Sequence, residues 1–165
     1  EHSLQLFFFF FFFVIGIIME KIIVSDSQRQ TLPTPPEIDP AQVERALTRY
    51  IAEKLNLTID KDIFRGGLPL GVDGIGVELT REELSNSAGL RTVYAIVCCR
   101  HASRDAVFAA IYSLADLFPV YGKTISVNNE DITFNAIMKE HVSLAATTDS
   151  GRIKHFGGIT LRIKL

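Results

Sequence analysis

The sequence predicts an α+β fold in which two helices pack on one face of a mostly antiparallel sheet. Two segments carry apolar residues at helical spacing, and several others alternate between apolar and polar residues. The last part of the chain reads as one strand after another, separated by short turns. The expected order of elements is α-β-β-β-α-β-β-β, with a long C-terminal hairpin.

The chain of 165 residues is long enough for one domain with a core. Residues 6–18 are apolar and include seven consecutive phenylalanines. These 13 residues would form a helix of only about 20 Å, short of the roughly 30 Å hydrocarbon core of a membrane. Because Met19 begins a stretch typical of a cytoplasmic protein, we interpret residues 1–18 as upstream or disordered sequence. Residues 19–39 are expected to form an arm or linker, and residues 40–165 a single folded domain.

The first helix is expected from residue 40 to about residue 56. Asp39 is placed to cap it, Pro40 suits its first turn, and Gln42 is placed to return the capping bond. The helical spacing predicts a buried stripe that consists of Val43, Ala46, Leu47, Tyr50, Ile51 and Leu55.

Residues 62–80 are rich in glycine and predict two short strands joined by a flexible hairpin turn. This stretch lacks the lysine and the serine or threonine of a phosphate-binding loop, and its glycines do not follow the dinucleotide-binding spacing. Residues 89–101 are apolar on both alternating faces. We therefore expect an interior strand that is covered on both sides over its centre.

The second helix is expected to begin after Ser103, which can cap it, and to end before Pro119. Its predicted buried stripe consists of Ala106, Val107, Ala110, Ile111, Leu114 and Phe118.

Strands are then expected at residues 124–127 and 132–146, with Asn128 and Asn129 in the turn between them. A second turn at residues 149–151 leads into the last strand, which ends at Leu165. Residues 159, 161, 163 and 165 of this strand are expected to face the core, and residues 160, 162 and 164 the other side.

Gly157 and Gly158 predict a bulge or bend in the last strand, where a ribbon leaves the sheet. Residues 147–156 would then form a protruding tip that touches another subunit.

The composition argues against several classes of function. Lysine and arginine number 17 against 19 acidic residues, a formal charge of −2, so the chain lacks the basic field that nonspecific DNA or membrane binding requires. Cys98 and Cys99 are adjacent on a strand and point to opposite faces, which does not favour a disulfide. With His101 they do not make the separated ligand pairs of a zinc site.

We expect no catalytic residue, no cofactor and no metal site, and we do not expect an enzyme. No motif places a nucleophile beside His101, His141 or His155. His141 and His155 are expected on opposite arms of the C-terminal hairpin.

Two charged clusters are candidates for contacts between neighbouring subunits, where complementary charge sets the register of association. One is acidic and lies near residues 81–83; the other is basic and lies near residues 152–154. With the hairpin turn, they supply the candidate interface residues Glu82, Glu83, Asp149, Ser150, Arg152, Lys154 and His155.

This predicted order, the run SRDAVFAAIYSLADLFP and the ending ATTDSGRIKHFGGITLRI together resemble bacteriophage minor capsid proteins of the tail terminator type. The resemblance covers roughly residues 40–165. It implies a virion structural protein of a long-tailed phage or prophage that forms a homo-oligomeric ring, commonly a hexamer, in the tail or neck.

By this resemblance the ring would cap the tail tube protein and present a surface to the head–tail connector protein. DNA would pass through its channel without specific binding. Assembly would take place in the host cytoplasm, with no membrane partner. The alternatives are a head–tail joining or head completion protein, and a small α+β ligand-binding domain or enzyme.

Overall fold

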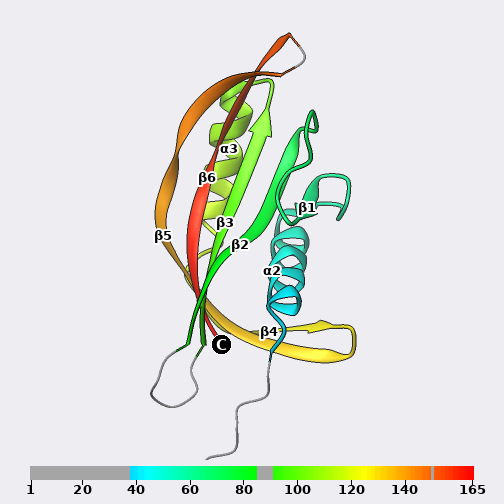
Figure 1. Cartoon of the computed structure of the whole chain (residues 1–165), viewed down its shortest axis with the longest axis vertical. Helices are drawn as coiled ribbons and strands as arrows, with labels where there is room; N and C mark the ends of the chain where they lie inside the picture. Colours follow the sequence, from blue (N-terminus) through cyan, green and yellow to red (C-terminus); the bar gives the residue numbers. More distant parts are fainter. Residues whose placement is uncertain (1–37, 85–90, 150) are drawn as a thin grey trace, which may run out of the picture. The chain divides into compact units, whose positions relative to one another are not determined.

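A six-stranded mixed sheet dominates the fold, with its strands in the spatial order β1-β2-β3-β6-β5-β4 (Figure 1). The computed structural model describes residues 38–84, 91–149 and 151–165. The α+β class predicted from the sequence is confirmed. In chain order the described elements are α2 (Pro40–Leu55), β1 (Ile63–Arg65), β2 (Gly74–Leu84), β3 (Arg91–His101), α3 (Arg104–Ala115), β4 (Val120–Val127), β5 (Glu130–Asp149) and β6 (Arg152–Lys164).

Several predictions concern segments outside the described residues. They include the assignment of residues 1–18 as upstream sequence, most of the arm at residues 19–39, and the turn residue Ser150. Within the described part of the chain, no helix combines the length and the apolar character that a membrane crossing requires.

Helix α2 begins and ends at residues that satisfy its terminal backbone groups. The carboxylate of Asp39 accepts a hydrogen bond from the backbone N–H of Ala41 at 2.9 Å, and Asn56 closes the helix in the left-handed conformation. The predicted return bond from Gln42 is wrong. Its side-chain amide donates instead to the carboxylate of Glu130, at the start of β5, at 3.1 Å.

Helix α3 begins after Ser103, whose hydroxyl accepts a hydrogen bond from the backbone N–H of Ala106 at 3.4 Å. The centre of the predicted stripe is confirmed, because Val107, Ile111 and Leu114 are buried.

The connection between β1 and β2 is not the hairpin turn that the glycines suggest. The two strands run parallel, with Ile63 opposite Ile75, so residues 66–73 must cross back along the sheet before β2 begins. This loop lies against β2 so closely that a Cβ at Gly76 would be 2.7 Å from the backbone N of Leu68. Glycine at position 76 is therefore a steric requirement of the crossover.

Strand β3 lies in the interior of the sheet, between β2 and β6, but the prediction that it is covered on both sides is wrong. One set of alternating side chains is buried under the helices, and the opposite set is only half-buried. The buried set consists of Val93, Ala95, Val97 and Cys99, and the half-buried set includes Tyr94, Ile96 and Cys98. An apolar run on both faces of a strand thus does not prove that both faces are covered.

The sheet curls, so that strands at its two ends meet the same helix. Helix α2 contacts β1 and β2 at one end of the strand order and β4 at the other, whereas α3 contacts β3 and β6 in the middle. The side chain of Tyr50 on α2 makes edge-to-face contacts with Phe118 and Phe134, with ring centroids 6.0 and 6.1 Å away. One buried cluster therefore joins both helices to the sheet.

Strand β6 pairs with β3 on one side and β5 on the other. Gly158 lies inside the sheet opposite Cys98, and it does not release a ribbon as the sequence suggested. The irregularities in pairing lie in the neighbouring strand β5, between Met138 and Glu140 and between Val142 and Ala145. A Cβ at position 158 would be 2.1 Å from the carbonyl oxygen of Val97, so the two backbones approach closely at this point.

We expect Gly158→Ala to lower the free energy of unfolding by about 2–4 kcal/mol, because two central strands must separate to accept the methyl group. Urea unfolding followed by circular dichroism measures the change. Gly151→Ala is the control: its φ of 76° is unfavourable for alanine but no atom lies within 4 Å, so about 1 kcal/mol is expected. Equal destabilisation by the two variants would contradict the close approach of the strands.

Candidate interaction surface at the C-terminal ribbon

Strands β5 and β6 continue past the end of β3 as a two-stranded ribbon (Figure 1). The last residue of β3 that pairs with β6 is His101, opposite His155. Beyond this point the two strands pair only with each other. We call residues 147–149 and 152–154 the ribbon tip; its pairs are Thr147–Lys154, Thr148–Ile153 and Asp149–Arg152. The long C-terminal hairpin predicted from the sequence is thus present.

The ribbon tip presents an apolar side chain as well as charge. Ile153 is 63% exposed and lies between Arg152, which is also exposed, and Lys154, which is half-buried. Neighbouring residues on a strand point to opposite faces, so Ile153 and its charged neighbours occupy different sides of the ribbon. The alternation of residues 152–154 contained this signal, but the sequence interpretation considered only the charges.

Lys154 is not a free surface charge. Its ammonium nitrogen lies 2.6 Å from the carboxylate of Asp73, in the loop of residues 66–73, and its side chain is only 14% exposed. The hydrogen bond from Lys154 holds the pKa of the Asp73 carboxyl below its usual value. This ion pair joins the ribbon tip to a loop far away in the sequence.

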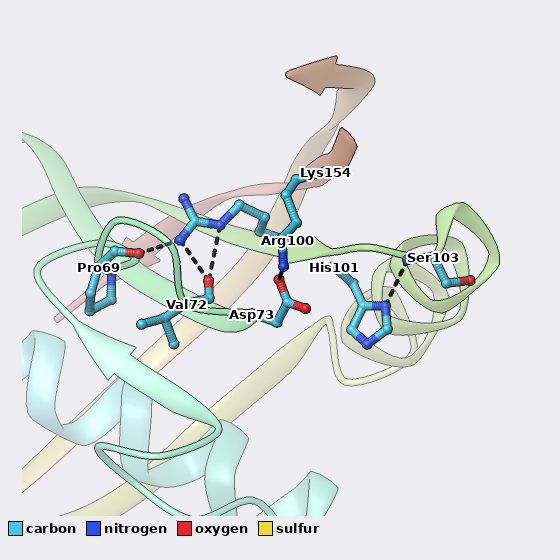
Figure 2. A network of polar contacts seen from close by, with 7 residues as sticks. All are labelled: Pro69, Val72, Asp73, Arg100, His101, Ser103 and Lys154. Atoms are coloured by element: carbon cyan, nitrogen blue, oxygen red, sulfur yellow. Dashed lines mark hydrogen bonds and ion pairs between the residues drawn. The ribbon is translucent and has the colours of Figure 1, made fainter. Parts of the chain in front are cut away.

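Arg100 fixes the same loop from the end of β3. Its Nε and one terminal nitrogen donate to the carbonyl oxygen of Val72 at 2.9 and 2.6 Å, and the terminal nitrogen also donates to the carbonyl oxygen of Pro69 (Figure 2). Leu70, between these two residues, is 94% exposed. The loop is thus held by its backbone while it presents an apolar side chain to solvent.

A cavity of about 270 Å³ lies beside this network, and its lining includes Asp73, Cys99 and His101. A cysteine, a histidine and an aspartate can together form a catalytic triad. Here, however, the contacts of His101 and Asp73 do not direct them toward the thiol of Cys99. The Nδ1 of His101 accepts a hydrogen bond from the backbone N–H of Ser103 at 2.9 Å, and Asp73 is paired with Lys154 (Figure 2).

The thiol of Cys99 is buried among apolar side chains and donates to the carbonyl oxygen of Gly157 at 3.3 Å. Burial raises the pKa of Cys99 to about 11, so the thiol stays protonated at neutral pH and is a poor nucleophile. Cys98 and Cys99 are both free, as predicted. Across residues 38–84, 91–149 and 151–165, no cluster of histidine, cysteine and acidic side chains could hold a metal ion.

The acidic cluster lies at the opposite end of the sheet from the ribbon tip. Glu83 is opposite Thr92 on β3, nine positions from His101, a separation of about 30 Å along a strand. Glu82 lies 3.4 Å from the Nε of Arg91, and Glu83 accepts a hydrogen bond from the hydroxyl of Tyr94 at 3.1 Å. Both carboxylates therefore have partners inside the subunit.

The remaining predicted interface residues also belong to the ribbon. Asp149 is the last residue of β5 and its backbone pairs with Arg152, while Ser150 lies outside the described residues. His155 is half-buried on β6, and His141 lies on β5, so the two histidines occupy opposite arms as predicted. The structure thus places Asp149, Arg152, Lys154 and His155 together and separates them from Glu82 and Glu83. Two residues were not found from the sequence: Asp73, which pairs with Lys154 of the ribbon, and Arg100, which holds the loop that carries Asp73.

No protein-family model matches this chain, and no curated protein matches it.

We expect Asp73→Asn to loosen the ribbon tip without unfolding the protein, because it removes the charge that holds Lys154. A partly exposed ion pair contributes up to about 1 kcal/mol, so amide hydrogen exchange at residues 152–154 should accelerate by up to about fivefold. The control is Asp60→Asn, since Asp60 is exposed and asparagine tolerates its left-handed backbone, with a φ of 64°.

The pH dependence of amide hydrogen exchange at the ribbon tip should follow the lowered pKa of Asp73. The contribution of the ion pair is complete above the ordinary carboxyl pKa of about 3.9 and is lost as the pH falls through the lowered value. If exchange at the ribbon tip is the same in Asp73→Asn and the unsubstituted protein near pH 7, the ion pair does not hold the ribbon.

Proposed function

We propose that this chain is a virion structural protein of the tail terminator type, a minor capsid protein whose subunits form a ring. The observation that carries this proposal is the ribbon tip, which extends past β3 and presents Arg152 and Ile153 to solvent. Exposed strand edges are commonly managed by pairing with or packing against another chain. The resemblance to tail terminator proteins is the reason for proposing a ring in a phage tail and not another kind of assembly.

The limited stability of a two-stranded ribbon favours contact with another protein chain. A two-stranded ribbon without a third strand or a helix is only marginally stable in water. Here the Lys154–Asp73 ion pair holds one side of the ribbon tip, whereas the side chain of Ile153 remains 63% exposed. Packing against a neighbouring subunit would bury this side chain and order the tip.

The separation of the two charged regions suits a ring. Closed rings repeat one contact in which different surfaces of neighbouring subunits meet. The ribbon tip with Arg152 and the end of β2 with Glu82 and Glu83 lie at opposite ends of the sheet, as a head-to-tail contact requires. Because the carboxylates are already paired within the subunit, such a contact would set register more than affinity.

In this proposal the ring caps the tail tube and meets the head–tail connector in the neck of the virion, after assembly in the host cytoplasm. DNA passes through the ring without specific binding. Binding of the ring to isolated tail tubes distinguishes a tail terminator from a head completion protein, which would bind the connector instead.

The proposal predicts that Arg152→Glu leaves folding intact and weakens assembly, because Arg152 is exposed on the ribbon tip. Size-exclusion chromatography with light scattering should show rings for the unsubstituted protein. The concentration needed for assembly should rise about tenfold for Arg152→Glu, as expected for loss of roughly 1.4 kcal/mol per contact.

Arg104→Glu makes the same charge change at an exposed position at the start of α3, where an acidic residue suits the helix dipole, and should assemble normally. Leu161→Asp should prevent folding, since Leu161 is completely buried. An unsubstituted protein that stays monomeric at every concentration would argue against the ring, and unchanged assembly of Arg152→Glu would exclude the ribbon tip as its contact.

A further inference from the structure

A cavity of about 380 Å³ lies where both ends of the curled sheet meet helix α2. Its lining includes three arginines: Arg45 and Arg49 from α2, and Arg65 from the end of β1. The turn between β4 and β5 closes the other side with Asn128, which adopts a left-handed conformation with a φ of 53°. Three elements that are distant in the sequence thus direct cationic and polar residues to one cavity.

Among the residues that the structure describes, the three arginines have no acidic partner. The described lining contains no aspartate or glutamate, and none of the three arginines forms an ion pair with another described residue. Arg49 is oriented by donation to the backbone carbonyl of Ser126, an acceptor without formal charge. Arg49 also lines an adjoining cavity with Asp131, whose carboxylate accepts a hydrogen bond from the hydroxyl of Ser126.

This arrangement is unfavourable in the absence of an anion. Like charges that share one cavity repel each other, and the half-buried Arg45 is screened less by water than the exposed Arg49 and Arg65. The chain as a whole carries a formal charge of −2, so the cluster is not the result of a generally basic surface. An anion from outside the subunit would convert this repulsion into attraction.

We propose that the cavity binds a phosphate group. Each guanidinium presents several N–H donors in a planar fork that matches the oxygens of phosphate or carboxylate. Donors that approach from α2, β1 and the β4–β5 turn surround the cavity on several sides. A carboxylate, with its two oxygens in one plane, would leave much of this set unused, whereas the tetrahedral oxygens of phosphate face several directions.

Other lining residues suit the same ligand. Thr48 is fully buried at the cavity wall and is uncharged, and its hydroxyl donates to the carbonyl of Glu44 at 2.8 Å. The volume is at the small end of the range for small-molecule sites and accepts a phosphate with part of the molecule that carries it. The phosphate comes either from a small molecule or from a nucleic-acid backbone, and both sources share this recognition chemistry.

The test is titration calorimetry on the full chain, with inorganic pyrophosphate at an ionic strength kept constant with sodium chloride. Saturable binding is expected for the unsubstituted protein. Each of the variants Arg45→Gln and Arg65→Gln should weaken it by about tenfold or more, because a charge-assisted hydrogen bond is lost. Arg65 is exposed, so its variant should fold even if replacement of the half-buried Arg45 disturbs α2.

Arg104→Gln is the matched control, because this arginine is exposed on α3 and does not line the cavity. Equal binding by Arg65→Gln and the unsubstituted protein, or no saturable binding, would overturn the proposal. Competition by a nucleoside monophosphate assigns the phosphate to a small molecule, and competition only by a short single-stranded DNA assigns it to a nucleic-acid backbone. A glutamate-rich peptide that competes better than every phosphate would also overturn the proposal.

Discussion

The curl of the sheet around helix α2 is the constraint on which the rest of the structure depends. A six-stranded sheet with β1 and β4 at its two ends presents two edges, and both reach the same helix. Tyr50 holds the β4–β5 end of the sheet on α2: it is buried, its ring meets Phe118 and Phe134, and its hydroxyl donates to the carbonyl of Leu117 at 3.1 Å. Edge-to-face aromatic pairs contribute about 0.5–1.5 kcal/mol each beyond their burial. Helix α2 thus serves both as core and as the connection between sheet ends.

Local patterns in the sequence predicted the elements whose structure depends on local physics. Both helices are amphipathic and carry capping residues, and β6 alternates, with Ile159, Leu161 and Ile163 buried. The parallel pairing of β1 with β2 was not predictable from glycine content. It depends on the hydrogen bonds from Arg100 to the crossover loop and on the close packing of this loop against Gly76. Strand β3 was assigned two covered faces because its apolar pattern cannot tell whether a second layer exists.

The candidate site was predicted only in part, for a similar reason. The sequence located the hairpin and its charged residues, but a charge does not indicate its own partner. Lys154 was grouped with Arg152 as surface charge, yet Asp73 neutralises it across 81 positions of sequence. Exposed Ile153 lies between these cations and was overlooked. Contacts between distant segments decide which side chains remain available, and a single sequence does not contain them.

The cationic residues differ in whether another group neutralises their charge, and this difference determines their roles. Lys154 is paired with a carboxylate and Arg100 is bonded to backbone carbonyls, so both hold the fold together. Arg152 is exposed on the ribbon tip, where water screens it, so its effect is on orientation more than on affinity. Arg45 and Arg65 differ from all of these, because they converge on one cavity without a described carboxylate. An anion bound there would connect α2 to β1 beside the β4–β5 turn, and would therefore stabilise the curl from the side of β1, whereas Tyr50 holds its β4–β5 side from inside the core.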